Sequence, residues 1–180
     1  MSRPGLKELE LVGLGGHLLH LLCYNDAMPS QAEWEFLTPE QQLWWAWLAG
    51  LIDGEGCIQI SPDRRYPNSF RLSLGILMTC QKAVRQAKHI AGGKVYNYPP
   101  PRSGRREVFR WQVLGKKAAT CLRICLPYFV VKKEEAAIAL QFIELQSLYG
   151  KGNQYRRVPA AVLERRRALA EALKILHKAP

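Results

Sequence analysis

The stretch Leu48-Ala-Gly-Leu-Ile-Asp-Gly-Glu-Gly56 decides how the rest of this chain is interpreted. Its first five residues are apolar or small, and its last four alternate carboxylates with glycine. Glycines at 54 and 56 favour the end of a helix, so the apolar part is expected to close a helix here. The carboxylates of Asp53 and Glu55 then stand at the junction between that helix and the next element.

Upstream of this stretch lies a strong helix start. Thr38 suits the N-cap, Pro39 suits the first helical position, and Gln41 completes a capping box. We predict a helix from Pro39 to about Asp53 that is apolar almost all round, which requires burial on more than one side. The small Ala49 and Gly50 would let another backbone approach closely.

Downstream, the pattern predicts strands at 57–61 and 70–78, a helix at 81–91, and strands at 94–98 and 107–114. Helices are predicted at 117–126 and 133–149. Two hairpins can form one antiparallel sheet with helices on one face, an α+β arrangement. The other face of the sheet would then be free for a ligand.

The chain divides into a core and two flanking segments. Residues 1–36 are interpreted as an N-terminal extension, 37–149 as the core domain and 150–180 as a helical tail. The tail should form a helix from Pro159, which either packs on the core or touches a ligand backbone.

Composition indicates a globular protein, because 48% of its 180 residues are hydrophobic. No apolar run approaches the roughly 18 residues that a membrane span needs. We expect a soluble intracellular protein, in an organelle or a bacterial cytoplasm. The five cysteines complete no zinc pattern, which favours buried free thiols over metal ligands.

Positive charge is concentrated in the middle of the chain. The formal net charge is +11, and residues 62–117 alone hold 13 Lys/Arg against 2 Asp/Glu. A basic region of this kind attracts polyanions, of which nucleic acid is the usual one. The alternative is a solubilising face, but such faces usually mix both signs.

The strands and their loops carry polar and basic residues suited to DNA phosphates and base edges. By alternation, Cys57, Gln59 and Ser61 share one side of the first strand, and Arg110 and Gln112 share a side of the last. Tyr98 could instead serve packing. The candidate DNA contacts are Gln59, Ser61, Arg64, Arg65, Arg71, Ser73, Tyr96, Tyr98, Arg102, Arg105, Arg106, Arg110 and Gln112.

Asp53 and Glu55 are candidates for metal chemistry. Oxygen ligands suit Mg²⁺, which keeps several waters and takes only one or two protein carboxylates. A metal beside a phosphodiester activates water and stabilises the leaving oxygen. A second copy of the chain, related by a two-fold axis, would supply a second such site. The alternative for Asp53-Gly-Glu-Gly56 is a simple polar turn.

Leu48 to Gly56 resembles the defining motif of the LAGLIDADG homing endonucleases in nearly every position. The resemblance extends from about Thr38 to Tyr149, where the expected order of elements is similar to the αββαββα core and saddle-like antiparallel sheet of that family. One motif per chain implies the homodimeric branch. The motif's apolar part would then be dimer interface as well as core: Leu48, Ala49, Gly50, Leu51 and Ile52.

The resemblance implies specific roles for residues at the motif's end. Its second acidic position, which coordinates divalent metal in the family, is Glu55 here, where Asp is more common. Gly54 would lend a backbone carbonyl nearby. Asp53 would serve the helix end rather than the metal. The implied cofactor is Mg²⁺ or another divalent metal such as Mn²⁺.

Further catalytic candidates follow from the same resemblance. Thr79-Cys-Gln-Lys-Ala-Val-Arg85 offers Gln81 and Arg85 at the family's spacing after the second strand. Leu126-Pro-Tyr-Phe-Val-Val-Lys132 offers Lys132 for stabilising charge or organising water. The ordinary alternatives are a helix cap for Gln81 and surface charges for Arg85 and Lys132.

Two functions remain open from the sequence. The first is a homodimeric, metal-dependent endonuclease that cuts double-stranded DNA at a long pseudo-palindromic target. The second is a binding module with the same fold: a maturase for a host intron RNA, or a regulator that does not cleave. An intact acidic residue at Glu55 favours the first.

Overall fold

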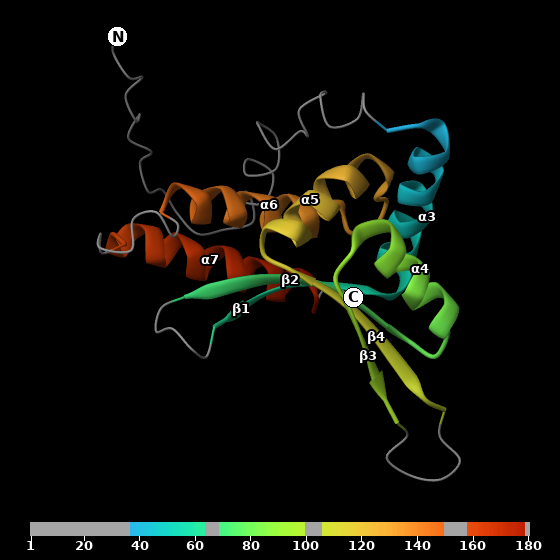
Figure 1. Cartoon of the computed structure of the whole chain (residues 1–180). Coiled ribbons are helices and arrows are strands. Elements are labelled where there is room, and N and C mark those ends of the chain that lie inside the picture. Colours follow the sequence, from blue (N-terminus) through green and yellow to red (C-terminus); the bar gives the residue numbers. More distant parts are fainter. Residues whose placement is uncertain (1–36, 64–68, 100–105, 150–157, 179–180) are drawn as a thin grey trace.

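The computed structural model describes residues 37–63, 69–99, 106–149 and 158–178. Figure 1 shows the helices and strands, which follow one another along the chain as one helix before each of two strand pairs and then further helices. The order confirms the predicted α+β class, with the core order αββαββα. The elements are α3 (Pro39–Glu55), β1 (Gly56–Pro62), β2 (Phe70–Met78), α4 (Gln81–Ala91), β3 (Lys94–Tyr98), β4 (Val108–Leu114), α5 (Lys116–Cys125), a 3-10 turn (Leu126–Tyr128), α6 (Lys133–Leu148) and α7 (Ala160–Leu176).

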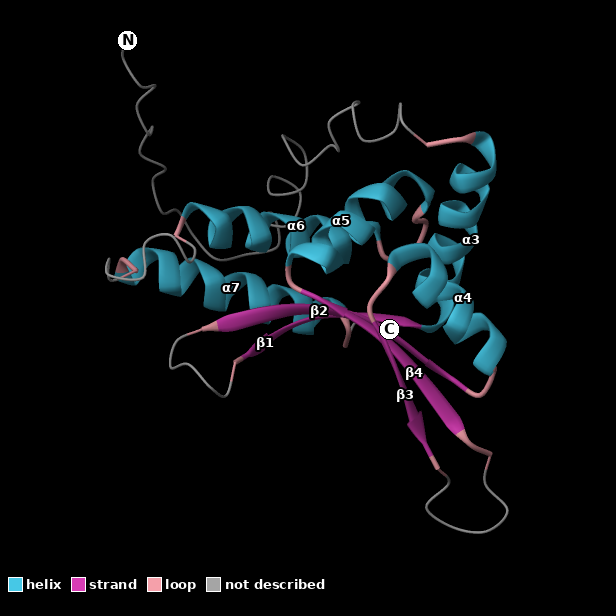
Figure 2. Cartoon of the chain, viewed as in Figure 1, coloured by secondary structure: helices cyan, strands magenta, loops and turns pink. Residues whose placement is uncertain are grey.

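The four strands form one antiparallel sheet in the order β1-β2-β4-β3. The two hairpins join through β2 and β4, with Ile76 opposite Trp111. The helices lie on one side of the sheet and leave the other side uncovered, as Figure 2 shows. We call the uncovered side the free face.

Strand residues alternate between the helical layer and the free face, as a period of two requires. Ile58, Leu74 and Trp111 point into the helical layer and are fully buried. They meet Leu122 of α5 and Phe142 of α6 in one continuous core. The core therefore fixes which side chains of every strand reach the free face.

The predicted capping box starts α3. The backbone N–H of Gln41 donates to Thr38 Oγ1 at 3.2 Å, and the N–H of Thr38 donates to Gln41 Oε1 at 2.9 Å. The helix continues two residues beyond the predicted end at Asp53, and Gly56 closes it by donating its N–H to the Ile52 carbonyl. Glu55 is therefore the last helical residue, directly before β1.

A turn at Gly92-Gly93 leads from α4 into β3. Both residues have positive φ, +68° and +87°, which only glycine adopts without strain. The Gly92 carbonyl accepts a hydrogen bond of 2.7 Å from the indole Nε1–H of Trp111. This bond ties the start of β3 to the buried face of β4.

The C-terminal helix α7 packs on the core, which settles the choice left open by the sequence. Leu169, Ala170 and Leu173 are buried against α6 and β1. His177, just after α7, bonds to Glu135 of α6 at 3.0 Å. Residues 1–36, interpreted as an extension, lie outside the described residues. No helix within the described ranges is long and apolar enough to cross a membrane.

The predicted buried thiols are confirmed for α5. Cys121 and Cys125 are both buried and unpaired. Burial, followed by the neighbouring Cys121 thiol, raises the pKa of Cys125 well above its ordinary value. No group of three or more His, Cys, Asp or Glu in the described part of the chain could hold a metal ion.

Candidate DNA-binding face and catalytic centre

The free face gathers polar side chains from all four strands. Strand pairing places Gln59 opposite Ser73, Ser61 opposite Arg71, and Tyr96 opposite Arg110. Tyr96 and Tyr98 are 40% and 46% exposed, so both rings are available for contact. Arg106, exposed, lies just before β4. Four expected contacts lie outside the described residues: Arg64, Arg65, Arg102 and Arg105.

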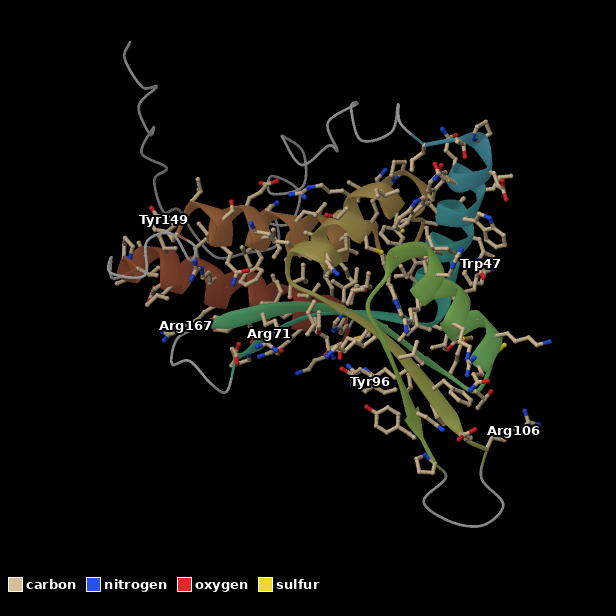
Figure 3. The ribbon with its side chains drawn as sticks, in the orientation of Figure 1. Trp47, Arg71, Tyr96, Arg106, Tyr149 and Arg167 are labelled. Carbon is tan, nitrogen blue, oxygen red and sulfur yellow. The ribbon has the colours of Figure 1, made fainter. Side chains whose placement is uncertain are left out.

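Two of the expected contacts are less available than the others, one because it is covered and one because it is paired. Ser73 is only 7% exposed, so its hydroxyl is largely covered. Arg71, near the start of β2, forms an ion pair with Asp63, which directly follows β1 at the same end of the first hairpin. Figure 3 shows Arg71 and Tyr96 on the side of the sheet away from the helices.

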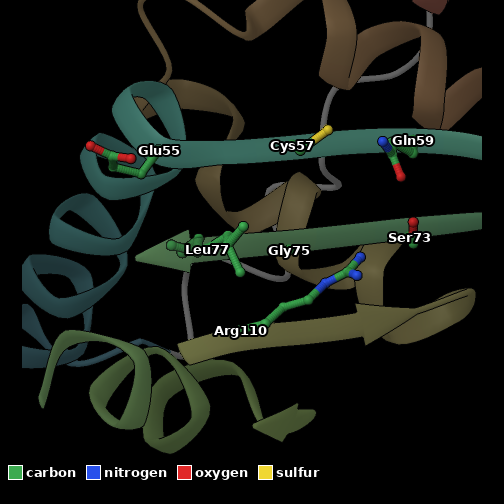
Figure 4. Close-up of a pocket in the computed structure, with 8 residues that line it drawn as sticks. Glu55, Cys57, Gln59, Ser73, Gly75, Leu77 and Arg110 are labelled. Carbon is green, nitrogen blue, oxygen red and sulfur yellow. The ribbon is translucent and has the colours of Figure 1, made fainter. Parts of the chain in front are cut away.

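A shallow hollow crosses the free face beside the end of α3. Glu55, Cys57 and Gln59 line one side, and Ser73, Gly75, Ile76, Leu77 and Arg110 line the rest. Arg110 extends from β4 toward β2 beside Gly75 (Figure 4). A Cβ at Gly75 would lie 3.0 Å from the Trp111 carbonyl oxygen and 3.7 Å from Arg110 Nε, so glycine keeps this approach open. The hollow places a carboxylate and a guanidinium on one surface.

Glu55 is exposed where α3 meets β1. Its carboxylate makes no hydrogen bond or ion pair with any other described residue. A carboxylate at a helix C-terminus also faces the negative end of the helix dipole, so a bound cation would be favoured there. Glu55 is therefore available to a ligand.

Asp53, by contrast, is fully used within the fold. Its Oδ2 accepts from the backbone N–H of Val130 at 2.8 Å and of Val131 at 3.3 Å, and its Oδ1 accepts from Lys132 N–H at 2.9 Å. These donors precede α6, whose first-turn N–H groups lack helical partners. The two acidic residues of the motif thus have separate environments.

Lys132 lies where Asp53 holds the backbone, and its side chain is largely covered. Its Nζ lies 3.8 Å from Glu135 Oε1, while Glu135 Oε2 bonds to His177 Nε2. Partial burial, and then the charge of Glu135, raise the pKa of the Cys57 thiol, which the charges of Lys132 and Arg110 oppose. The charges of Lys132 and Glu135 therefore act on a thiol that lines the hollow.

Gln81 and Arg85 both lie exposed on α4. Gln81 is the first helical residue, and the preceding N-cap, Cys80, makes no side-chain cap bond. Because Gly56 pairs with Ile76, β2 ends beside the start of β1, and α4 begins close to that end. The role of either residue in catalysis stays a prediction.

Solved structures of known proteins share this fold. I-CvuI, a homing endonuclease solved with its target and calcium, is 26% identical over 79% of this chain and 87% of that chain, at a TM-score of 0.62. The archaeal intron-encoded homing endonuclease I-Vdi141I, solved with DNA, is 14% identical over 78% of this chain and 87% of its own, at 0.57. The LAGLIDADG homing endonuclease I-GzeII is 15% identical over 71% of this chain and 43% of its own, at 0.54. No protein-family model matches the chain, and no curated protein is similar to it in sequence.

The motif at the end of α3 and the sheet with its free face point to the same group of proteins as these structural neighbours. The chain shares the fold of LAGLIDADG homing endonucleases, and its motif is similar to theirs. The helix that carries the motif is α3, and it ends beside the hollow of the free face.

The end of the LAGLIDADG helix fits a divalent metal as one half of a site. Glu55 supplies an exposed carboxylate, and the carbonyl of Gly54 lies in the last helical turn, where carbonyls have no helical donor. Mg²⁺ commonly takes few protein oxygens and completes its shell with water and phosphate. The donor set suits such an ion if nucleic acid and a second chain contribute the rest.

The exposed side of α3 differs from the predicted interface. Leu48, Ala49 and Ile52 have 0% exposure in the single chain, because they pack into its own core. Gly50 remains exposed and Leu51 partly exposed. The outward stripe instead includes three large residues: Leu43 (72% exposed), Trp44 (42%) and Trp47 (38%). Figure 3 shows Trp47 on the outer side of α3.

Several residues at the site were not singled out from the sequence. Lys94 faces the free side opposite Gln112, and its spacing with Tyr96 and Tyr98 could have revealed it. Glu135 was not singled out because its second partner, His177, lies 42 positions further along the chain. Leu77 was not singled out because an apolar residue in a strand is ordinarily expected in the core.

Proposed function

We propose that this chain is a homodimeric endonuclease that cuts double-stranded DNA at a specific site with the help of a divalent metal. The observation that carries the proposal is Glu55. Its carboxylate is exposed at the end of the LAGLIDADG helix, without an internal partner among the described residues, and beside the hollow of the free face. A protein that only binds DNA has no need of a free carboxylate among cations, where it would repel phosphate.

The free face supports DNA as the partner. Arg110, Lys94 and Gln112 stand on adjacent strands, with Arg106 at the approach to β4. Arg and Gln side chains bind guanine and adenine edges bidentately, and Lys neutralises phosphates. The neighbours I-CvuI and I-Vdi141I were solved in complexes with a target and with DNA respectively.

A second copy of the chain would pack against the outward stripe of α3. Trp47, Leu43 and Gly50 lie on that stripe, and a Cβ at Gly50 or Gly54 would meet nothing within 4 Å inside the chain. Glycines on one helix face let two helices approach closely. A two-fold dimer through α3 would bring two copies of Glu55 to its axis, one for each DNA strand.

Within each half-site, the chain's own residues would divide the chemistry. Glu55 and the Gly54 carbonyl would hold the divalent metal, which supplies an activated water and stabilises charge on the leaving oxygen. Lys132 would place its ammonium near the scissile phosphate and stabilise negative charge that develops there. Gln81 would orient water from the start of α4, with Arg85 one turn further along.

The experiment is a selection of cleaved sequences from a randomised duplex library in magnesium. Wild type should enrich one long, approximately palindromic target, and Glu55→Gln should enrich none. The matched control is Glu144→Gln, an exposed glutamate on α6 that should cleave like wild type. Cleavage that survives Glu55→Gln would remove the metal role of Glu55.

Binding without cleavage by wild type would favour the alternative, a regulator or a maturase for intron RNA. A filter-binding assay with the randomised duplex library and with structured RNA separates these two. Glu55 gives the nuclease the better support, because neither alternative uses its free carboxylate.

A further inference from the structure

The free face carries an apolar side chain among its polar ones. Leu77, near the end of β2, is 54% exposed, although its neighbour Ile76 is 1% exposed. The strand register explains this orientation, because Leu77 pairs with Arg110 while Ile76 pairs with Trp111. Leu77 therefore points to the same side as Arg110, and its apolar surface stays in water unless a ligand covers it.

Leu77 and Arg110 form one contact surface. Directly opposite residues of an antiparallel pair lie about 5 Å apart at Cβ, so their tips reach neighbouring positions on a ligand. Arg110 extends toward β2 beside Gly75, whose missing side chain leaves that space open (Figure 4). Arg110 forms no ion pair with a carboxylate within the described ranges, so its guanidinium is available.

The chemistry of the major groove gives each of these side chains one natural partner. Guanine presents two acceptors, O6 and N7, which a guanidinium binds bidentately. Thymine presents a C5-methyl group, which is the apolar feature of the groove floor. A leucine has no donor or acceptor, so the methyl group is the base-edge feature that it can distinguish.

We propose that Leu77 selects thymine in each half-site by covering its C5-methyl group, next to a guanine bound by Arg110. The proposal rests on the proposed function, because it requires the free face to bind DNA. It names Leu77 as a specificity-determining residue and the C5-methyl as the group that it recognises.

The test replaces each thymine of the selected target, one position at a time, by deoxyuridine, which lacks only the C5-methyl. Affinity of the full chain is measured by fluorescence anisotropy with calcium in place of magnesium. We expect one position in each half-site where deoxyuridine weakens binding about fourfold, the factor for about 0.8 kcal/mol per buried methyl-sized group. Leu77→Ala should bind thymine and deoxyuridine equally at that position.

Two variants keep the result interpretable. Leu77→Met retains an apolar tip and should keep the deoxyuridine effect. Leu148→Ala changes a leucine that is 71% exposed on α6, behind the sheet, and should behave like wild type throughout.

A wild-type scan in which no thymine depends on its methyl group overturns the proposal, and this scan needs no variant to fold. An unchanged deoxyuridine profile in Leu77→Ala overturns it equally. Failure of the proposed nuclease function looks different, because wild type then cleaves no duplex and the selection enriches none.

Discussion

The carboxylate of Asp53, inside the LAGLIDADG motif, accepts a hydrogen bond of 2.9 Å from the backbone N–H of Lys132, which lies 79 positions further along the chain. The same carboxylate also binds the N–H groups of Val130 and Val131. One side chain thus fixes the segment that carries the candidate lysine relative to the helix that ends in Glu55.

Replacing this carboxylate should destabilise the fold. In Asp53→Asn the single amide oxygen cannot satisfy donors that now meet two carboxylate oxygens, and hydrogen bonds to a charged group contribute about 1.5–3 kcal/mol. We expect the free energy of unfolding, from urea titration, to fall by about 2 kcal/mol. Glu55→Gln, which loses no partner among the residues that the structure describes, should change it by less than about 0.5 kcal/mol; equal losses in both variants would contradict the separation of roles.

The ammonium group of Lys132 should matter for rate rather than for binding. Lys132→Met keeps the length of the side chain but removes its charge, and loss of one group that stabilises a transition state typically costs about 100-fold or more. We expect a single-turnover cleavage rate lower by about 100-fold, with DNA affinity within about threefold of wild type. Lys133→Met, at an exposed neighbour, is the control, and a similar loss in both variants would point to general electrostatics.

The outward stripe of α3 should hold the dimer together. Gly50→Leu places a large side chain where the single chain has open space, so it should leave the monomer folded while blocking close approach of a second α3. Sedimentation should show a dimer for wild type and a monomer for Gly50→Leu, with equal helical circular dichroism. Ala161→Leu, at an exposed site on α7, should remain dimeric. A dimeric Gly50→Leu would place the interface elsewhere.

Cys57 should report on occupancy of the free face. Partial burial, and then Glu135, raise the pKa of its thiol, so less thiolate is present at pH 8 than for an ordinary cysteine. Alkylation by iodoacetamide should therefore rise at a more alkaline pH than in the urea-unfolded chain. By linkage, the stability contributed by this thiol is present at neutral pH and declines as pH rises through the thiol range.

Mass spectrometry of the Cys57 peptide should show protection by target DNA, whereas unchanged labelling would place DNA elsewhere.

Local chemistry made much of the fold predictable. Thr38, Pro39 and Gln41 determine where α3 begins, and Gly92-Gly93 determines where β3 follows α4. Period-two alternation in the strands gave the correct faces for Gln59, Arg71 and Arg110. These features depend on residues that are close together in the chain, so they can be predicted from the sequence.

Features that depend on distant contacts were not predictable. Alternation shows on which face of the sheet each side chain lies, but it does not show which strands pair. The pairing of β2 with β4 could therefore not be predicted. Because α3 is apolar all round, its sequence could not tell Leu48, which packs into the chain's own core, from Trp47, which stays at the surface. Nor could it show that Asp53 binds the segment before α6, or that Leu77 points outward.

A supercoiled plasmid that carries the selected target shows whether each Glu55 of a dimer supports cleavage of one DNA strand. Wild type in magnesium should convert the plasmid to the linear form, and Glu55→Gln should leave it supercoiled. A preparation purified as mixed dimers, with one Glu55→Gln copy carrying a distinct affinity tag, should accumulate the nicked circle. Linear plasmid produced by the Glu55→Gln homodimer at a rate near that of wild type would rule out this role for Glu55.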